Sequence, residues 1–355
     1  MSLSLRDDDT YPVRTCDDDL LTRLRRCLLA LAVGAFVAGC SGNASTPTPV
    51  ATASPAAVVS PTIPGATPPP QPSPVRPSLP PQSPRDGPWN RDVLSYRSSD
   101  GVTFKEPVTV VERAGVPNVI VDHSGRLVAV FQWFPFTQRA AFDRVAVAVS
   151  SDGGRSWTAP APMDIAGIPA DLQRPFDPTI VQLPDGRYRL YFTSGVASGT
   201  GQGNVGIYSA ISVDAIRFQF EPGPRFAPSG GTVDASVVLF RGAWHLFSHN
   251  QRANSGQGYH ATSQDGLAFT QQPDVNVGQG RQWIGNALVD GETLRYYGSG
   301  MGGVWSAVSR DGVEWTVDPG VRVDGGDASV VILENGERIL LAVGPLRADA
   351  GPSPF

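Results

Sequence analysis

The sequence has few charged residues and almost no lysine. Charged side chains make up 17% of its 355 residues, and Lys105 is the only lysine among the 28 basic residues. The formal net charge of −5 argues against a nucleic-acid-binding protein that works through bulk positive charge. Long stretches rich in Ala, Leu, Glu and Lys are missing, which disfavours a helical bundle or a coiled coil.

Cysteine is absent from most of the chain. The three cysteines are Cys16, Cys27 and Cys40, and none follows residue 40. The part beyond residue 40 can therefore form neither a disulfide nor a cysteine-ligated metal site, and its core alone must stabilise it. Phosphate-binding loops and zinc signatures are also missing, so we expect no metal and no cofactor.

Residues 1–40 have the layout of a secretory signal. Three arginines (Arg23, Arg25 and Arg26) precede an apolar run over residues 27–39, which is too short to span a bilayer. Residues 37–41 read VAGCS and resemble the bacterial lipobox, which implies cleavage before Cys40 and its lipidation. We therefore expect a protein held by a lipid at the bacterial cell envelope, outside the cytoplasm. The alternative is an ordinary signal peptide with a chance cysteine.

Residues 41–88 form a predicted linker. They hold 15 prolines among Ser, Thr, Ala and Gln, and only Arg76, Arg85 and Asp86 are charged. Such a stretch cannot bury a core and stays extended, reaching on the order of 100 Å. We interpret it as a disordered stalk that places the folded part, residues 89–355, away from the membrane.

One turn motif recurs five times in residues 89–355. Each copy, which we call an Asp turn, has Ser two residues before Asp and an aromatic residue shortly after it. The aspartates are Asp100, Asp152, Asp214, Asp265 and Asp311, at steps of 52, 62, 51 and 46 residues. Asp followed by Gly suits a tight turn between antiparallel strands, because Gly accepts positive φ. The near-regular spacing predicts a repeat.

A second motif alternates with the Asp turns: an apolar strand, a Gly-containing turn and another strand. The copies begin near Asn118, Asp177, Asp234, Asn286 and Asp327. Each unit then has four strands in about 50 residues, which is typical of a β-propeller blade. The chain enters with the second half of a blade and ends with the first half. We therefore predict an all-β, five-bladed propeller whose last blade is closed by N-terminal strands.

These motifs carry a family resemblance that covers essentially all of 89–355. The Asp turns resemble the Asp boxes, or BNR repeats, of sialidases. The blade count and the segment DPTIVQLPDGRYRLYF at 177–192 resemble five-bladed arabinanase- and levansucrase-type glycosidases. The resemblance implies a carbohydrate-active protein of the glycoside hydrolase type. A fold does not fix a function, and such repeats also occur in non-catalytic propellers.

Strand direction predicts where a site lies. The innermost strands start at the top face, so that strand starts and the loops between second and third strands surround the upper channel. Glycoside hydrolysis uses paired carboxyls, and we expect Asp177, Asp234 and Asp327 to ring the channel as catalytic candidates, with His249 as a further acid candidate. The alternative for the three aspartates is a structural role in capping backbone amides of the next blade.

The remaining candidates are substrate-binding residues. Trp133 and Trp283 are expected to stack on sugars, and several arginines to bind a carboxylate. The other members are Asn118, Arg139, Arg174, Arg252, Arg281 and Asn286. In the five-bladed relatives the first blade supplies an Asp, and the position that we match to it is Asn118. An arginine triad with a nucleophilic tyrosine, as the sialidase resemblance would imply, cannot be assigned.

Two functions follow from these features. The first is an envelope-anchored glycosidase of the sialidase or arabinanase type, acting on extracellular glycans. The second is a propeller that binds a glycan or a protein without catalysis, which the missing first-blade Asp favours. In both cases we expect a monomer with an extracellular ligand and no nucleic-acid partner.

Overall fold

The structure, a computed structural model, describes residues 86–196, 205–250, 256–352 and 354. The predicted signal segment (1–40) lies outside these residues, as does the predicted linker (41–88) up to residue 85. The described part is all-β apart from the short 3₁₀ helix η1 (Pro88–Asn90). Within it, no helix is long and apolar enough to cross a membrane.

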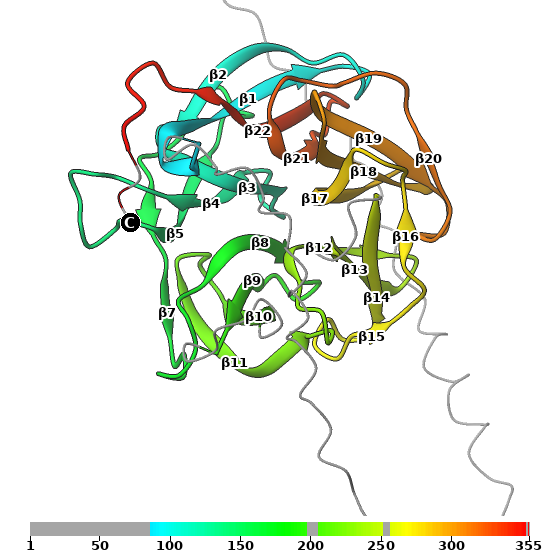
Figure 1. The fold of residues 1–355 in the computed structure, drawn as a ribbon, viewed down its shortest axis with the longest axis horizontal. Helices are drawn as coiled ribbons and strands as arrows, with labels where there is room; N and C mark the ends of the chain where they lie inside the picture. The colour runs from blue at the N-terminus through cyan, green and yellow to red at the C-terminus, as the bar shows by residue number, and fades with distance from the viewer. Residues whose placement is uncertain (1–85, 197–204, 251–255, 353, 355) are drawn as a thin grey trace, which may run out of the picture. The chain divides into compact units, whose positions relative to one another are not determined.

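The strands form five antiparallel blades around a central axis, as predicted (Figure 1). Blade 1 contains β3 (Ala114–Val121), β4 (Leu127–Trp133), β5 (Arg144–Ser150) and β6 (Ala161–Pro162). Blade 2 contains β8 (Phe176–Gln182), β9 (Tyr188–Gly195), β10 (Val205–Ser212) and β11 (Arg217–Phe226), with β7 (Asp164–Ala166) parallel to β11. Blade 3 contains β12 (Val233–Phe240), β13 (Ala243–His249), β14 (Gln257–Ser263), β15 (Thr270–Gln271) and β16 (Val275–Asn276).

The last two blades show how the ring closes. Blade 4 contains β17 (Arg281–Asp290), β18 (Thr293–Gly300), β19 (Gly303–Ser309) and β20 (Trp315–Val317). Blade 5 contains β21 (Gly326–Ile332), β22 (Arg338–Leu346), β1 (Arg91–Ser98) and β2 (Lys105–Val111). Its two halves come from opposite ends of the described chain, and β1 pairs with β22 from Arg91↔Leu346 to Ser98↔Arg338. This confirms the predicted closure, which removes the open sheet edges that an unclosed ring would leave.

A ring of hydrogen bonds joins the innermost strands β3, β8, β12, β17 and β21, which surround the centre in Figure 1. One polar residue in each strand bonds to the backbone of the next blade: Asn118 to Ile180, Thr179 to Ala235, Ser236 to Ala287, Asn286 to Val330 and Ser329 to Val119. All five are buried, so these bonds also satisfy groups that water cannot reach. The ring fixes each blade against its neighbour.

The hydrophobic core is divided into five clusters, each between two adjacent blades. The cluster between blades 3 and 4 is rich in aromatic side chains, and Phe247, Trp283, Tyr296 and Trp305 are all buried there. Because each large side chain removed from water contributes about 1.5–3 kcal/mol, such clusters can hold the blades together without disulfides.

The Asp turns connect the third and fourth strands of all five blades. In each, the Ser hydroxyl donates to the Asp carboxylate, which accepts two backbone N–H bonds from residues that follow it, such as Val313 and Glu314 at Asp311. These bonds lower the pKa of all five aspartates. Gly266 and Gly312 have φ of +71° and +80°, which explains the glycine after Asp in these turns.

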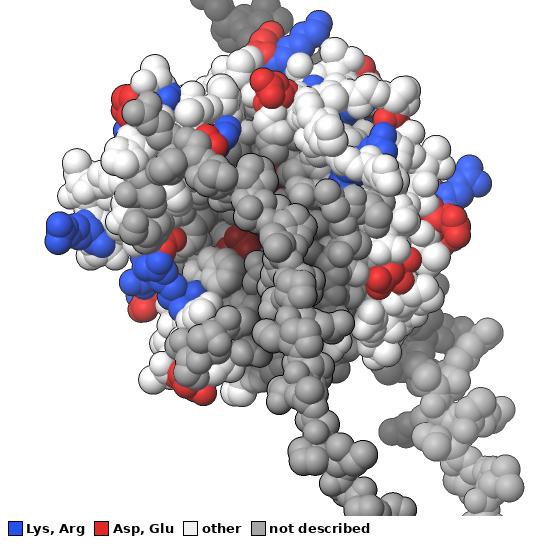
Figure 2. Space-filling model, viewed as in Figure 1, with Lys and Arg blue, Asp and Glu red and all other residues white. Residues whose placement is uncertain are grey.

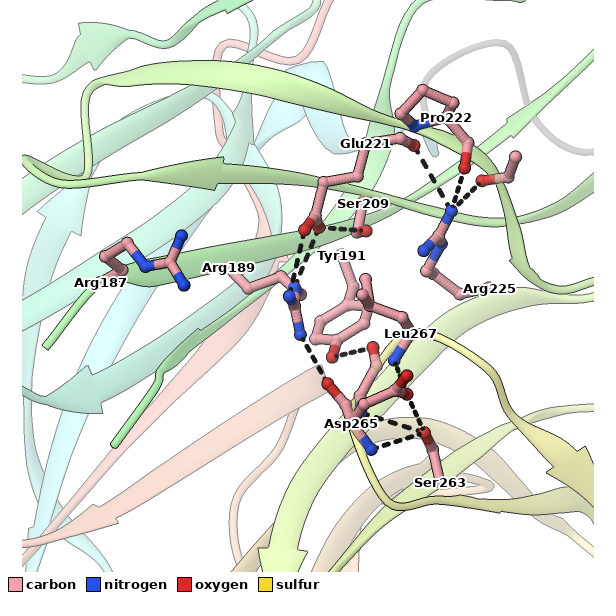
Figure 3. A network of polar contacts seen from close by, with 12 residues as sticks. Arg187, Arg189, Tyr191, Ser209, Glu221, Pro222, Arg225, Ser263, Asp265 and Leu267 are labelled. Carbon is pink, nitrogen blue, oxygen red and sulfur yellow. Dashed lines mark hydrogen bonds and ion pairs between the residues drawn. The ribbon is translucent and has the colours of Figure 1, made fainter. Parts of the chain in front are cut away.

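The turns also join neighbouring blades (Figure 3). The Tyr191 hydroxyl of blade 2 donates to Gly266 O in the Asp turn of blade 3, at 2.7 Å. Arg189 donates to Asp265 O in the same turn and forms a bidentate pair with Glu221, which also accepts from Ser209. Arg189 is 6% exposed, so its charge is held by a fully paired network rather than by water.

Candidate active site

The innermost strands break their regular pairing near their upper ends. The register with the second strand shifts between Gly115 and Asn118 in blade 1, and at the corresponding place in the other four blades. At four of the breaks the residue has positive φ: 50° at Val116, 50° at Asp177, 55° at Asp234 and 49° at Asp327. Such bulges turn a side chain away from the regular strand direction and cluster at functional sites.

The bulges bring the three predicted aspartates to the top of the channel. Asp177, Asp234 and Asp327 line one small space together with Val116 and Ile284, which occupy the equivalent positions in blades 1 and 4. We call this space the neck. Its volume of about 10 Å³ holds one water molecule at most. A sugar ring therefore cannot enter the neck and would have to bind above it.

This alignment corrects one prediction. We matched Asn118 to the first-blade Asp of the five-bladed relatives, but the backbone places Val116 in line with Asp177, Asp234 and Asp327. Asn118 is the counterpart of Thr179, Ser236, Asn286 and Ser329 in the inter-blade ring. The sequence carries the same alignment, because Pro117 follows Val116 as Pro178 follows Asp177, so the match to Asn118 was two residues off. Blade 1 therefore has no carboxyl at the neck.

Crowding and burial set the electrostatics of the neck. Burial, with the charge of Asp327 as second cause, raises the pKa of Asp177 to about 7. Burial also raises the pKa of Asp234 well above its ordinary value, and the charges of Asp177 and Asp327 add to the effect. The pKa of Asp327 is also raised, mainly by burial. Because their pKa values are raised and coupled, one neck carboxyl can be protonated while another is ionised near neutral pH. A protonated acid and an ionised base can therefore stand side by side.

Neighbouring hydroxyls hold these aspartates in place. The Thr193 hydroxyl bonds to the Asp177 carboxyl and accepts the N–H of Asp234 at 3.2 Å, so one side chain connects the two. Ser299 accepts the N–H of Asp327 at 2.7 Å. The Asp327 carboxyl also accepts the N–H of Val116 in the next blade, which is the structural role considered from the sequence. Within the described residues, the carboxyls of Asp177 and Asp234 accept no such hydrogen bond from a backbone N–H.

Asp177 also lines a larger cavity, the inner cavity, of about 530 Å³. Its walls are formed by Pro88, Trp89, Val116, Gln132, Phe134, Asp143, Gln173, Arg174, Phe176 and Asp177. Trp89 and Phe134 lie edge to face with ring centres 6.2 Å apart. Of the three neck aspartates, only Asp177 is among the described residues that line this cavity. Its volume suits a ligand of one or two sugar rings.

Three polar side chains form one wall of the inner cavity. Asp143 makes an ion pair with Arg174 and accepts a hydrogen bond of 2.7 Å from Gln132 Nε2. Gln132 is 4% exposed, and its Oε1 has no hydrogen-bond partner among the described residues. A buried acceptor of this kind costs free energy unless a ligand donor or water reaches it. The wall therefore offers an acceptor for a hydroxyl group.

The two predicted tryptophans are not available for stacking. Trp283 is 0% exposed, and Trp133 is 7% exposed. Both belong to hydrophobic clusters between blades, so the prediction that they stack on sugars is wrong for this structure. The side chains of Asn118 and Asn286, also predicted to bind substrate, accept hydrogen bonds in the inter-blade ring. An aromatic or amide side chain at the start of an innermost strand is thus used in packing against, or bonding to, the neighbouring blade.

The other candidates lie at several places. Arg174 lines the inner cavity but is paired with Asp143, Arg139 lines a separate cavity, and Arg281 donates to Val277 O. His249 ends β13 opposite Val233, is half-buried, and its Nδ1 has no partner among the described residues. Burial lowers the pKa of His249, which keeps it neutral near pH 7. Arg252 lies outside the described residues.

Some lining residues were missed in the sequence. Trp89 directly follows the predicted linker, Asp143 lies in the loop between β4 and β5, and Gln173 precedes β8. None of them belongs to a repeated motif, which is why repeat analysis passes over them. The single signal was the tryptophan directly after a proline-rich stretch, which is unusual in a disordered segment.

Comparison with known proteins supports the fold. Neither a protein-family model nor a curated protein matches the sequence. Among solved structures, an endo-arabinase from Bacteroides thetaiotaomicron has a TM-score of 0.50 and 15% identity, covering 67% of this chain and 95% of its own. An endo-1,4-beta-xylanase from the same organism has a TM-score of 0.50 and 14% identity, covering 67% and 87%. The predicted likeness of fold to arabinanase-type glycoside hydrolases is confirmed, and at this identity it shows the fold alone.

Proposed function

We propose that this protein is a glycoside hydrolase that acts on an extracellular glycan through Asp177 and Asp234. The observation that carries the proposal is the position of Asp177, which lines both the neck and the inner cavity and whose carboxyl has a raised pKa. Asp234 lies at the same neck, joined to Asp177 through Thr193. Paired carboxyls with separated pKa values are what acid–base cleavage of a glycosidic bond requires.

The electrostatics suggest a role for each carboxyl. Asp234, whose pKa is raised by burial and by both neighbouring charges, keeps its proton and serves as the proton donor to the leaving oxygen. Asp177, with a pKa of about 7, is partly ionised near neutral pH and acts as base or nucleophile. Asp327, whose carboxyl also accepts the Val116 N–H, contributes a negative charge that raises the pKa of both neighbours. His249 is neutral near pH 7 and is better suited to hydrogen-bond the substrate than to donate the proton.

The inner cavity is the proposed position of the sugar, with the bond to be cleaved at its Asp177 end, beside the neck that Asp234 lines. Trp89 and Phe134 offer aromatic surface to the apolar face of a ring, and the buried Gln132 Oε1 can accept a hydroxyl hydrogen. The shared fold with the arabinase and the xylanase makes arabinosides and xylosides the first substrates to try.

The proposal is tested with a hydrolysis screen of purified protein on fluorogenic arabinosides, xylosides, fructosides, galactosides and sialosides. We expect turnover of at least one of them, and loss of that turnover in Asp177→Asn. The matched control is Asp152→Asn in an Asp turn, which removes the same charge far from the cavity. Equal activity in wild type and Asp177→Asn would contradict the proposal.

The second candidate function is binding without catalysis. It is favoured by the absence of a carboxyl from blade 1, where Val116 stands at the neck. A glycan array separates the two functions: binding to one glycan class with no hydrolysis in the screen, and loss of binding in Trp89→Ala, would establish a non-catalytic propeller.

We further propose that a lipid on Cys40 anchors the protein at the cell envelope and that it acts as a monomer. The support for the lipid anchor comes from the sequence alone, namely the basic flank, the apolar run and the VAGCS segment. Cys40→Ser is expected to move the protein from the membrane fraction to the soluble fraction of the envelope, with no lipid found by mass spectrometry. An unchanged distribution would show that the cysteine is incidental.

A further inference from the structure

A second cavity of about 460 Å³, the outer cavity, lies beside the proposed active site. It shares only Arg174 with the inner cavity and includes none of the neck residues. Its apolar surface comes from Phe142, Val145, Met163, Ile165, Ile168 and Leu172. Three arginines, Arg139, Arg144 and Arg174, complete the lining together with Ala140 and Pro175. Nothing in the proposed hydrolysis uses this cavity.

The interior of the outer cavity suits hydrocarbon rather than sugar. Val145 and Met163 are 4% and 2% exposed and form its deep surface. Among the described residues, no hydroxyl, amide or carboxylate side chain lines it, so a sugar would lose the hydrogen bonds of its hydroxyls to water and gain few in return. An alkyl chain has no such groups to lose and gains free energy by leaving water.

The charge of the outer cavity is positive and uncompensated. Arg139 and Arg144 are exposed, and neither makes an ion pair or a side-chain hydrogen bond with a residue that the structure describes. Arg174 is neutralised by Asp143. In a protein with a net charge of −5, two free guanidinium groups beside an apolar cavity favour an anionic group. At the left of the face in Figure 2, where Figure 1 places the β4–β5 connection and β7, Lys and Arg side chains lie together with a few Asp and Glu side chains.

We propose that the outer cavity binds an anionic amphiphile, with a single hydrocarbon chain against Met163, Ile168 and Leu172 and a carboxylate or phosphate head on Arg139 and Arg144. The proline-rich segment of this chain is a poor occupant, because Arg76 and Arg85 are the only charged residues in 41–85 and have the same sign as the cavity. A single chain fits a cavity of this volume, whereas a bilayer surface presents many heads at once.

The test is calorimetric titration of the full-length protein with decanoate and with decyl phosphate. Decyl maltoside, which has a neutral head, and acetate, which has no chain, are the controls. We expect saturable binding of both anionic probes at one site, weakened at least about tenfold in the Arg139→Gln/Arg144→Gln double variant. Arg310→Gln removes an exposed arginine outside this cavity and should leave binding unchanged.

Two further arms keep the test decisive if a variant folds poorly. Raising the salt concentration should weaken decanoate binding to the wild type, since the head is held by charge. Leu172→Ser should also weaken decanoate binding, since the hydrocarbon chain loses apolar contact. Equal binding of decyl maltoside, equal binding of acetate, an unaffected double variant, or binding only to anionic vesicles would each overturn the proposal. Hydrolysis does not enter these readouts, so the result is independent of the proposed function.

Discussion

The five aspartates of the Asp turns and the three aspartates of the neck belong to the same repeat but lie at different positions in the blades. The turn aspartates are exposed, each accepts several hydrogen bonds, and their pKa values are lowered. The neck aspartates lie at strained bulges close to one another, and their pKa values are raised. The same residue type thus stabilises the fold in one place and opposes it in the other.

This contrast separates structure from function better than repetition does. A carboxylate that recurs in all five blades and accepts several hydrogen bonds from backbone N–H groups has few lone pairs left to bind a ligand. A carboxylate present in only three blades, at positive φ and with a raised pKa, is retained at a cost in stability, which is typical of active sites.

The largest expected effect is on activity. Asp234→Asn should lower kcat/KM by about a thousandfold on the glycoside that the wild type hydrolyses, because the amide cannot donate the proton. Asp265→Asn, in an Asp turn, should leave kcat/KM nearly unchanged. Steady-state kinetics on both variants makes the comparison, and an equal loss in the two would remove the distinction between the two sets.

The next effect is on stability, with opposite signs for the two sets. Asp177→Asn should stabilise the protein by about 2 kcal/mol at pH 8, because it removes a charge that is crowded and poorly solvated. Asp311→Ala should destabilise it by about 1 kcal/mol, a loss kept small by solvent at the exposed turn. Denaturant unfolding measures both, and destabilisation by Asp177→Asn would show that the neck is stabilising.

The pH dependence of stability should also differ between the two sets. A neck aspartate keeps its proton in the folded protein, so its contribution is fully present below the unfolded pKa of about 4 and is lost as pH rises through about 7. A turn aspartate contributes above about pH 4 and loses that contribution as pH falls through its lowered folded pKa. Melting curves of wild type, Asp177→Asn and Asp311→Asn from pH 3 to 9 would reveal both trends. Parallel curves for all three would contradict them.

The smallest effect concerns blade 3. Blades 2 and 4 carry an arginine, a carboxylate and a serine across three strands, as in Arg295–Asp318–Ser306. Blade 3 has His245 and His260 at the corresponding strand positions, with ring nitrogens 3.0 Å apart.

Burial lowers the pKa of His260 to about 4. The contribution of the neutral His260 to the free energy of unfolding is therefore fully present above about pH 6.5 and is lost as pH falls toward 4. His260→Gln should reduce that loss by about 1 kcal/mol in urea titrations. An unchanged pH profile would mean that this pair does not titrate with folding.

The sequence predicted the features that repeat. Asp turns at near-regular steps indicated the blades, their number and the closure between the chain ends, because each follows from local turn chemistry and strand count. The site was predicted only in part. Asp177, Asp234 and Asp327 share a motif and were found, whereas the first blade was aligned two residues off, at Asn118 instead of Val116, although Pro117 matches Pro178. Trp89 and Asp143 come from connections that do not repeat, and burial of Trp133 and Trp283 depends on the packing between blades.

The central claim is that the aspartates at the neck form an acid–base pair unlike the aspartates of the turns. Carboxyl ¹³C chemical shifts followed against pH, assigned by comparison with Asp177→Asn, Asp234→Asn and Asp311→Asn, measure it directly. We predict that Asp177 titrates near pH 7, that the pKa of Asp234 lies well above the ordinary value of an aspartate, and that the pKa of Asp311 lies below it. Titration of all three near pH 4 would contradict it.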